Sequence, residues 1–482
     1  MMIRILMPKR RLLVFMNVNQ GYQSYKELIT IQNELYEEGE NELRDSIVSS
    51  IYMQAEEIAN KVVERDQTKK FYWDKKLDDI LTSKYTGFPI MFLILGFVFW
   101  LTVTGANYPS AVLANVLFDI EGELTNWFMS VNAPEWIHGM LILGVYRTLA
   151  WVVSVMLPPM AIFFPCFTLL EDLGYLPRVA FNLDKLFKKA GAHGKQSLTM
   201  SMGFGCNAAG VIACRIIESP RERLIAMLTN NFVPCNGRFP TLIALATIFV
   251  GGWVGSQYSI FAASLFVSFL VLIGIGVTLL VSWALSKTLL KGVPSSFTLE
   301  LPPYRRPQFG RIIYTSMIDR TLFVLSRAVV VAAPAGLVTW ILANVMIGNQ
   351  SILAHGAGFL QPFAHLIGLD GFILMAFILG LPANEIVLPI LIMSYMSKGS
   401  MIELDSIQAM KELFIANGWT WLTTLNVMLF SLLHYPCATT LWTMKKESGS
   451  TKWTLFGAIM PTVIAVVVLL VITQVVRLLG LV

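Results

Sequence analysis

Long apolar stretches are the feature of this sequence that most limits its possible folds. A helix needs about 20 apolar residues to cross a hydrocarbon core of roughly 30 Å. Stretches of that length occupy residues 86–106, 138–165, 224–250, 257–286, 320–347, 418–443 and 453–480. Because 55% of the residues are hydrophobic and only 14% are charged, we predict an all-α polytopic membrane protein with about seven full transmembrane helices.

The first 80 residues differ from the remainder and predict a small cytoplasmic helical segment, residues 1–80. Apolar residues between Leu43 and Val62 recur at spacings of four and three, as on one face of a soluble helix. The opening "MPKRR" is basic, but its apolar run is short and no small-residue cleavage site follows. We therefore expect no signal peptide and a cytoplasmic N-terminus.

Two weaker apolar stretches, 197–217 and 371–396, are interrupted by Gly, Pro, Asn and Glu. The first lies between loops rich in lysine and arginine, which both belong on the cytoplasmic side. It must therefore enter and leave the membrane on one face. If 371–396 does the same from the outside, Lys445, Lys446 and Lys452 also fall inside. We predict two re-entrant helical hairpins that insert from opposite faces.

The sequences around the two predicted hairpins share a pattern of residues. Gly203 and Asn207 have the same spacing as Gly380 and Asn384, and a Pro-Cys pair follows in each half, at 234–235 and 436–437. The chain is thus predicted to contain an inverted repeat, and paired interruptions of this kind indicate the central site of a transporter. The expected segments are a first helix with an external loop (81–137), repeat 1 (138–290), a cytoplasmic linker (291–319) and repeat 2 (320–482).

Three cysteines are the main candidates for a metal path: Cys206, Cys235 and Cys437. Each lies at a predicted helix break, where the proline or glycine leaves backbone carbonyls without partners. Sulfur together with carbonyl and amide oxygens suits a borderline divalent metal such as ferrous iron better than magnesium or calcium. Cys166 and Cys214 are interpreted as packing residues.

The polar residues beside these cysteines each have more than one interpretation. Asn207 and Asn384 are either ligands or caps of half-helices. Glu385 is either a ligand, a proton-linked group or a cap, because a carboxylate at membrane depth is costly without a purpose. His434 and Arg238 are possible members of a surrounding shell: the histidine either ligates or is a hydrogen-bonded structural residue, and the arginine is expected to pair with an acid or with carbonyls.

Other classes of function have little support in the sequence. "GAHGKQS" at 191–197 lacks the spacing of a phosphate-binding loop, so we expect neither a nucleotide site nor an enzyme in these residues. The pI of about 8.8 is accounted for by cytoplasmic loops and predicts no nucleic-acid partner. No permanently bound cofactor is expected.

Three long motifs resemble the membrane portion of FeoB-type ferrous iron transport proteins, including both of their gate regions. They are "GFGCNAAGVIACRIIESPRERLIAMLTNNFVPCNGRFP", "LGLPANEIVLPILIMSYM" and "HYPCATTLWTMKKESGSTKWTLF". The resemblance extends from about residue 45 to the end. It implies a multi-pass protein of the bacterial inner membrane that takes up Fe²⁺, with Cys206, Cys235 and Cys437 lining the path.

Members of that family normally begin with a GTP-binding domain, for which this sequence shows no motif. The resemblance therefore implies a separate GTP-binding protein, a truncated or split chain, or transport without GTP. Small accessory Feo proteins and further copies of the chain are other expected partners, beside Fe²⁺ and the lipid bilayer. Two alternatives stay open: a nucleoside or other solute transporter with the same hairpin plan, and a non-transporting gate-domain membrane protein.

Overall fold

The computed structural model describes residues 47, 50–59, 61–62, 69–83, 85–250, 259–292, 304, 306–397, 399–401 and 407–480. Its contacts divide the chain into two units, residues 1–72 and 73–482. In the first unit, residues 50–59 are helical, as the apolar spacing predicts. The basic opening of the chain lies outside the described residues.

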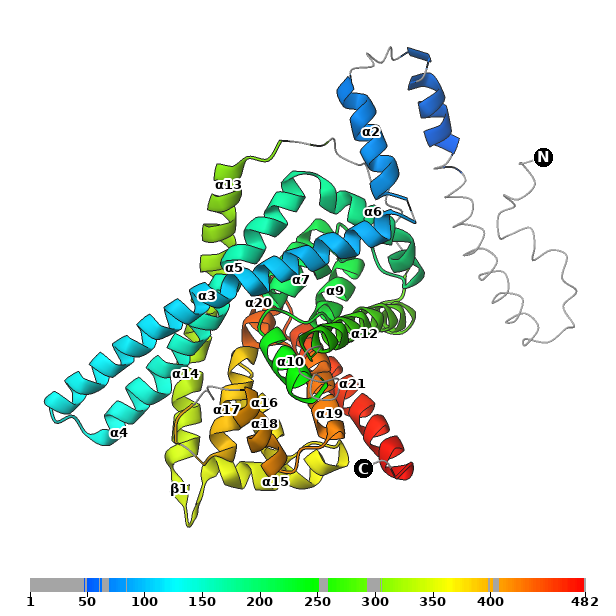
Figure 1. The fold of residues 1–482 in the computed structure, drawn as a ribbon. Coiled ribbons are helices and arrows are strands. Elements are labelled where there is room, and N and C mark those ends of the chain that lie inside the picture. Colours follow the sequence, from blue (N-terminus) through cyan, green and yellow to red (C-terminus); the bar gives the residue numbers. More distant parts are fainter. Residues whose placement is uncertain are drawn as a thin grey trace, which may run out of the picture. The chain divides into compact units, whose positions relative to one another are not determined.

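The second unit is built almost entirely of helices, and it confirms the prediction of an all-α polytopic membrane protein (Figure 1). A two-residue antiparallel ladder, β1 (Met346–Ile347) with β2 (Gln350–Ser351), is the exception among the described residues. Five helices there are long and apolar enough to cross a membrane: Gly87–Ser130, Glu135–Asp172, Ala262–Lys287, Phe309–Asn344 and Thr451–Leu478.

Two bent pairs raise the number of possible spans to seven. Ile352–Leu366 and Gly371–Leu379 meet at 112°, and Gln408–Ala416 meets Trp421–Ser448 at 107°. The last helix illustrates why lipid is the fitting environment, because its exposed aliphatic residues recur every four positions and form one continuous apolar stripe. That stripe includes Leu455, Ile459, Val463, Val467 and Val471.

The region expected as an external loop, 107–137, is mostly helical, which corrects the prediction. Helix α3 (Gly87–Ser130) has 44 residues and is therefore about 66 Å long, twice the hydrocarbon thickness. Acidic residues in this region lower its hydropathy but do not interrupt a helix. The Arg147 guanidinium on α5 (Arg147–Asp172) donates to the Glu121 carboxylate on α3 at 2.8 Å, and this bond links the two long helices.

The long helices have short elements next to them in the chain, and further short helices lie between residues 172 and 259. After α2 (Lys69–Leu81) and α3 come α4 (Glu135–His138), η2 (Gly139–Tyr146), α5 (Arg147–Asp172) and α12 (Ser259–Lys287). The helix expected at 320–347 begins earlier, so the end of the expected linker 291–319 is helical. It consists of α13 (Phe309–Tyr314), η6 (Thr315–Leu322) and α14 (Phe323–Asn344), and the last span is α21 (Thr451–Leu478).

The spans expected at 224–250 and 418–443 are each broken where the sequence has its Pro-Cys pair. Proline lacks the amide hydrogen that continues a helix, and residues on either side of it form separate helices. In the first half these are α9 (Pro220–Thr229), η4 (Asn230–Phe232), α10 (Phe239–Leu245) and η5 (Ala246–Val250). In the second half they are α19 (Trp421–Leu433) and α20 (Ala438–Ser448), and α18 (Ile407–Ala416) precedes α19 across a separate break.

Each half also contains an interrupted pair of short helices. In the first half α6 (Tyr175–Lys189) precedes α7 (Gln196–Gly205), α8 (Asn207–Ala213) and η3 (Cys214–Ile216). In the second half α15 (Ile352–Leu366) precedes α16 (Gly371–Leu379), η7 (Asn384–Ile386) and α17 (Val387–Tyr395). In both halves a longer helix precedes two short ones, although the 3₁₀ segment follows the second short helix in the first half and precedes it in the second.

The chain doubles back between α7 and α8. Lys195, just before α7, donates through Nζ to the carbonyl of Ile216 at 3.2 Å. Gly203 and Gly210 both lie against the side-chain amide of Asn230. A straight helix would separate residues seven positions apart by about 10 Å, so these contacts require a hairpin.

The second interrupted pair doubles back in the same way, and α16 and α17 lie side by side in Figure 1. Tyr395 at the end of α17 donates to the carboxylate of Asp370, which caps the start of α16. Close to the turn, Gly380 lies against the side chain of Val387. Each half thus contains one helical hairpin, α7 with α8 and α16 with α17.

Charged contacts gather the loops predicted to be cytoplasmic at one end of the second unit. Arg215 and Glu447 form an ion pair of 2.7 Å, and Lys195 pairs with Glu218 at 3.2 Å. Loops predicted to be external lie elsewhere: Asn344, at the far end of α14, donates to the carbonyl of Gly399 at 2.6 Å.

Candidate functional site

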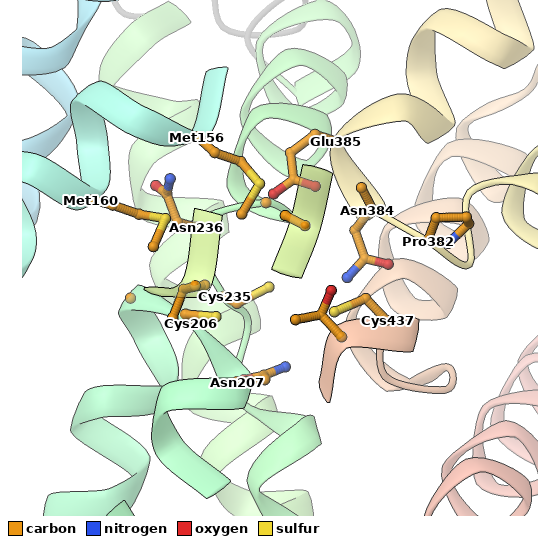
Figure 2. A pocket seen from close by; sticks show the side chains of 16 residues that line it. Met156, Met160, Cys206, Asn207, Cys235, Asn236, Pro382, Asn384, Glu385 and Cys437 are labelled. Carbon is orange, nitrogen blue, oxygen red and sulfur yellow. The ribbon is translucent and has the colours of Figure 1, made fainter. Parts of the chain in front are cut away.

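The two hairpin turns and the two Pro-Cys breaks meet around one cavity. Its lining consists of Met156, Met160, Gly205, Cys206, Asn207, Cys235, Asn236, Gly237, Val324, Ala328, Pro382, Ala383, Asn384, Glu385, Cys437 and Thr439. The space open to the centre of a water-sized sphere is about 30 Å³, which fits one or two waters or a dehydrated cation. All six residues predicted as metal ligands line this cavity (Figure 2).

Matching backbone geometry places the two hairpin turns. Cys206 links α7 to α8 with φ −156° and ψ 126°, and Ala383 precedes η7 with φ −150° and ψ 121°. These extended residues interrupt the helical hydrogen bonds and direct the following Asn207 and Asn384 toward the protein interior, where both are buried. The equal spacing of glycine and asparagine in the sequence therefore reflects equal local structure.

Each break is fastened to the hairpin turn of its own half. The amide of Asn236 donates to the carbonyl of Gly205 at 3.3 Å, and the amide of Ala438 donates to the carbonyl of Leu381 at 2.8 Å. Cys235 and Cys437 immediately precede these donors. The two bonds thereby fix a thiol of each break beside a hairpin turn.

The carboxylate of Glu385 reaches from the second hairpin to the first break. A methyl group added at Gly237 would lie 2.0 Å from Glu385 Oε1, so this position accepts only glycine without displacement of the carboxylate. Glu385 is also close enough to interact electrostatically with the thiols of Cys235 and Cys437. The site thus combines the carboxylate of the second half with thiols from both halves.

The lining is not a preformed metal centre. Within the described ranges, no three His, Cys, Asp or Glu side chains converge closely enough to hold a metal ion. Cys206 does interact electrostatically with Cys235 and Cys437, so the three thiols share one neighbourhood. A cation in the cavity would require small movements of the side chains or would be held by few of them at a time.

The two asparagines do not cap the half-helices, because Cys206 and Ala383 occupy the capping positions. With its amide oriented as its neighbours require, Asn207 donates to the carbonyls of Gly203 and Val233, both at 3.2 Å. Asn384 Oδ1 is buried and has no hydrogen-bond partner among the described residues. Asn207 therefore ties the turn to the break, whereas Asn384 keeps an oxygen available for a ligand.

Arg238 binds backbone carbonyls that the breaks leave unpaired, as expected from the sequence. Its guanidinium donates to the carbonyls of Asn231, Leu432, His434 and Tyr435 and to Asn231 Oδ1, at 2.8–3.3 Å. The residue is 1% exposed. It connects the two halves just outside the cavity lining.

His434 also lies outside the lining. Its Nδ1 is 2.8 Å from the carbonyl of Phe430, and its Nε2 is buried without a partner in the part of the chain that the structure describes. Cys214 is fully buried and its thiol bonds to the carbonyl of Gly210 at 3.3 Å, which confirms its interpretation as a packing residue. Cys166 is half-buried and does not line the cavity.

Sequence reasoning missed two methionines of the lining, Met156 and Met160 on α5. The signal that could have revealed them is the stretch "MLPPM". Its spacing of four places both side chains on one helical face, and Pro158 and Pro159 between them lie inside the continuous helix α5. Asn236 and Thr439, each near a Pro-Cys pair, were also missed.

These features define a class: polytopic membrane proteins whose two halves bring paired helix breaks to a common cavity. The family model Gate, described as nucleoside recognition, matches residues 153–249 and 325–451. The model for the C terminus of ferrous iron transport protein B matches residues 267–319. The chain belongs to the FeoB family.

Curated relatives support this assignment along most of the chain. A Staphylococcus aureus (strain COL) protein named Fe(2+) transporter FeoB is 30% identical over 476 residues, covering 92% of this chain and 68% of the relative. The Fe(2+) transporter FeoB of Methanocaldococcus jannaschii is 27% identical, covering 92% and 65%. A Porphyromonas gingivalis protein named as a fusion of Fe(2+) transport protein A and FeoB is 27% identical, covering 80% and 49%. No solved structure gives a significant match.

Proposed function

We propose that the protein transports ferrous iron across the cytoplasmic membrane through the cavity between its two halves. The observation that carries the proposal is the convergence of Cys206, Cys235, Cys437 and Glu385 on that cavity. The names of the relatives, which are Fe(2+) transporters, support the same substrate.

The chemistry of the lining suits a cation that must both enter and leave. Sulfur and oxygen donors together favour Fe²⁺ over the hard cations Mg²⁺ and Ca²⁺. Conduction also requires binding weak enough to permit release, and a lining without a preformed set of three ligands satisfies that requirement. We propose Asn207 and Asn384 as further lining residues of this path, the latter through its unpartnered oxygen.

The proposed topology has two inverted repeats, 138–290 and 320–482, with re-entrant hairpins that insert from opposite faces. The loops rich in lysine and arginine would face the cytoplasm, together with the N-terminus and the ion pair of Arg215 with Glu447. The membrane would be the bacterial inner membrane. Thiol labelling of single cysteines placed at Glu218 and Asn349, from either side of spheroplasts, tests this orientation.

Partners are a further part of the proposal. No nucleotide-binding loop occurs in the 482 residues, so any GTP-dependent gating would come from outside these residues. The fusion of Fe(2+) transport protein A with a FeoB relative supports an accessory Feo protein as a partner. Association of several copies of the chain is also proposed.

A nucleoside is the competing substrate, since the description of the Gate model refers to nucleoside recognition. The space of about 30 Å³ is far too small for a ribose and a base. Recognition of those groups would also need several hydrogen-bonding side chains at both hairpin turns. We therefore favour iron and include nucleoside as an arm of the test.

Uptake of ⁵⁵Fe²⁺ into proteoliposomes under reducing conditions tests the proposal. We expect Cys206→Ser combined with Cys437→Ser to lower the initial rate by at least about tenfold, because hydroxyl oxygen is a much poorer ligand than sulfur for this metal. Cys166→Ser, which changes a cysteine outside the cavity, is the matched control. Undiminished iron flux in the double variant, or competition by nucleosides, would contradict the assignment.

Gly237→Ala should reduce iron uptake by roughly tenfold, although it adds only one methyl group. That methyl group would collide with the Glu385 carboxylate, and a small displacement of a binding group is costly to function. Gly276→Ala is the matched control, because nothing lies within 4 Å of the added group there. Equal uptake rates for the two variants would show that the position of Glu385 is unimportant.

A further inference from the structure

Two methionines form one wall of the cavity, and neither is explained by the ligands already proposed. Met156 and Met160 lie one turn apart on α5 and both face the lining. Figure 2 shows their side chains reaching into the same space as Cys206 and Glu385. Helix α5 also packs against η7, which carries Asn384 and Glu385.

A neighbouring helix, α14, provides an internal comparison, because it packs against α5. It presents Val324 and Ala328, which also lie one turn apart and face the same cavity. The same cavity is therefore lined by two thioethers from α5 and by two aliphatic groups from α14. An apolar wall alone would not require sulfur, as α14 demonstrates.

Charge in and around the cavity makes neutral sulfur ligands useful. Glu385 is the one carboxylate in the lining, and the fixed guanidinium of Arg238 is close enough to act on Cys235 and Cys437. Additional anionic ligands would hold a divalent cation too firmly for release. A thioether adds affinity for softer metals without adding charge, and it does not depend on deprotonation.

We propose that Met156 and Met160 are specificity-determining ligands of this path, which bind the passing Fe²⁺ transiently and disfavour harder cations such as Mn²⁺. This inference rests on the proposed transport function and deepens it. Fe²⁺ exceeds Mn²⁺ in affinity for a given site, and soft sulfur ligands enlarge the difference. The pair therefore sets which metal crosses, while Glu385 and the thiols provide the basic affinity.

The competing explanation is that both methionines are flexible packing groups, a common role of this residue. Met160 is 1% exposed and belongs to an apolar cluster, and Met156 contacts two such clusters. Leucine has nearly the same volume and is well tolerated in place of methionine. Met156→Leu with Met160→Leu therefore removes sulfur while keeping the packing.

The test compares initial uptake of Fe²⁺ and Mn²⁺ into proteoliposomes containing the full chain. We expect the double leucine variant to lose about tenfold of its preference for Fe²⁺ over Mn²⁺, the lower end of the effect that groups around a metal have on its binding. Met200→Leu, a buried methionine outside this cavity, should leave the ratio unchanged. Val324→Met in the double variant should restore part of the preference, because it returns one sulfur to the lining from α14.

The outcomes separate this inference from the proposed function. Absence of Fe²⁺ uptake by the unaltered protein would overturn transport itself, and the inference with it. Fe²⁺ uptake with an unchanged metal ratio in the double variant would overturn the inference alone. Size-exclusion profiles and thermal unfolding of each variant identify any that fail to fold. Fe K-edge absorption provides a second measurement on the unaltered protein and on the double variant. The contribution of sulfur to the iron coordination must be smaller in the double variant.

Discussion

Replacement of Arg238 by methionine should lower the free energy of unfolding by about 3–5 kcal/mol. The guanidinium donates to four backbone carbonyls and one side-chain oxygen that belong to both breaks. Burial of a charge opposes this stabilisation, but loss of the donor would leave several buried acceptors unpaired at once. Steric trapping in mixed micelles measures the free energy of unfolding of the variant and of the unaltered protein.

Arg215→Met is the control for that measurement. Its ion pair with Glu447 involves an arginine side chain that is 63% exposed, and such pairs contribute roughly 0–1 kcal/mol. A similar loss of stability in the two variants would show that removal of any arginine destabilises the fold. The hydrogen bonds of Arg238 to carbonyls of both halves would then have no special role. The comparison thus isolates the contribution of the carbonyls at the breaks.

Glu385→Gln should reduce Fe²⁺ uptake by at least about tenfold, equal to roughly 1.4 kcal/mol of transition-state or binding free energy. Glutamine keeps the shape that fits against Gly237 but removes the one negative charge among the lining side chains. The desolvation of Fe²⁺ would then be offset only by neutral donors. Initial uptake rates at several iron concentrations separate a change in apparent affinity from a change in maximal rate.

Glu218→Gln provides the matched control, because this side chain is 80% exposed and pairs with Lys195 at the surface. We expect its uptake to equal that of the unaltered protein. If Glu385→Gln retains full uptake, the carboxylate is a structural group and the proposed path must depend on sulfur and amide ligands alone. Unchanged expression and unfolding temperature are required before either rate is compared.

The positions of the helix breaks could be predicted from the sequence. Proline at 234 and 436 removes backbone donors, and the chain breaks there in the structure. Glycine and asparagine around 203–207 and 380–384 likewise predicted two interrupted segments, and each doubles back. These features depend on residues close in sequence, which is why the pattern alone reveals them.

The extent of the helices was less predictable. Acidic residues suggested an external loop at 107–137, but α3 continues to Ser130. Hydropathy reports where lipid is tolerated, whereas a helix continues as long as its backbone bonds and neighbours allow. The ion pair of Glu121 with Arg147 provides such a neighbour 26 positions away, which no local pattern shows.

By itself the sequence determined that the chain is an all-α membrane protein with two matching sets of helix breaks, because apolar length, proline and glycine act within a few residues. Only the tertiary structure decided which side chains share the cavity. It placed Glu385 against Gly237, directed Arg238 to the carbonyls of both halves and brought Met156 and Met160 into the lining. These relations depend on packing between segments far apart in the chain, and that packing is fixed only when all the helices are assembled.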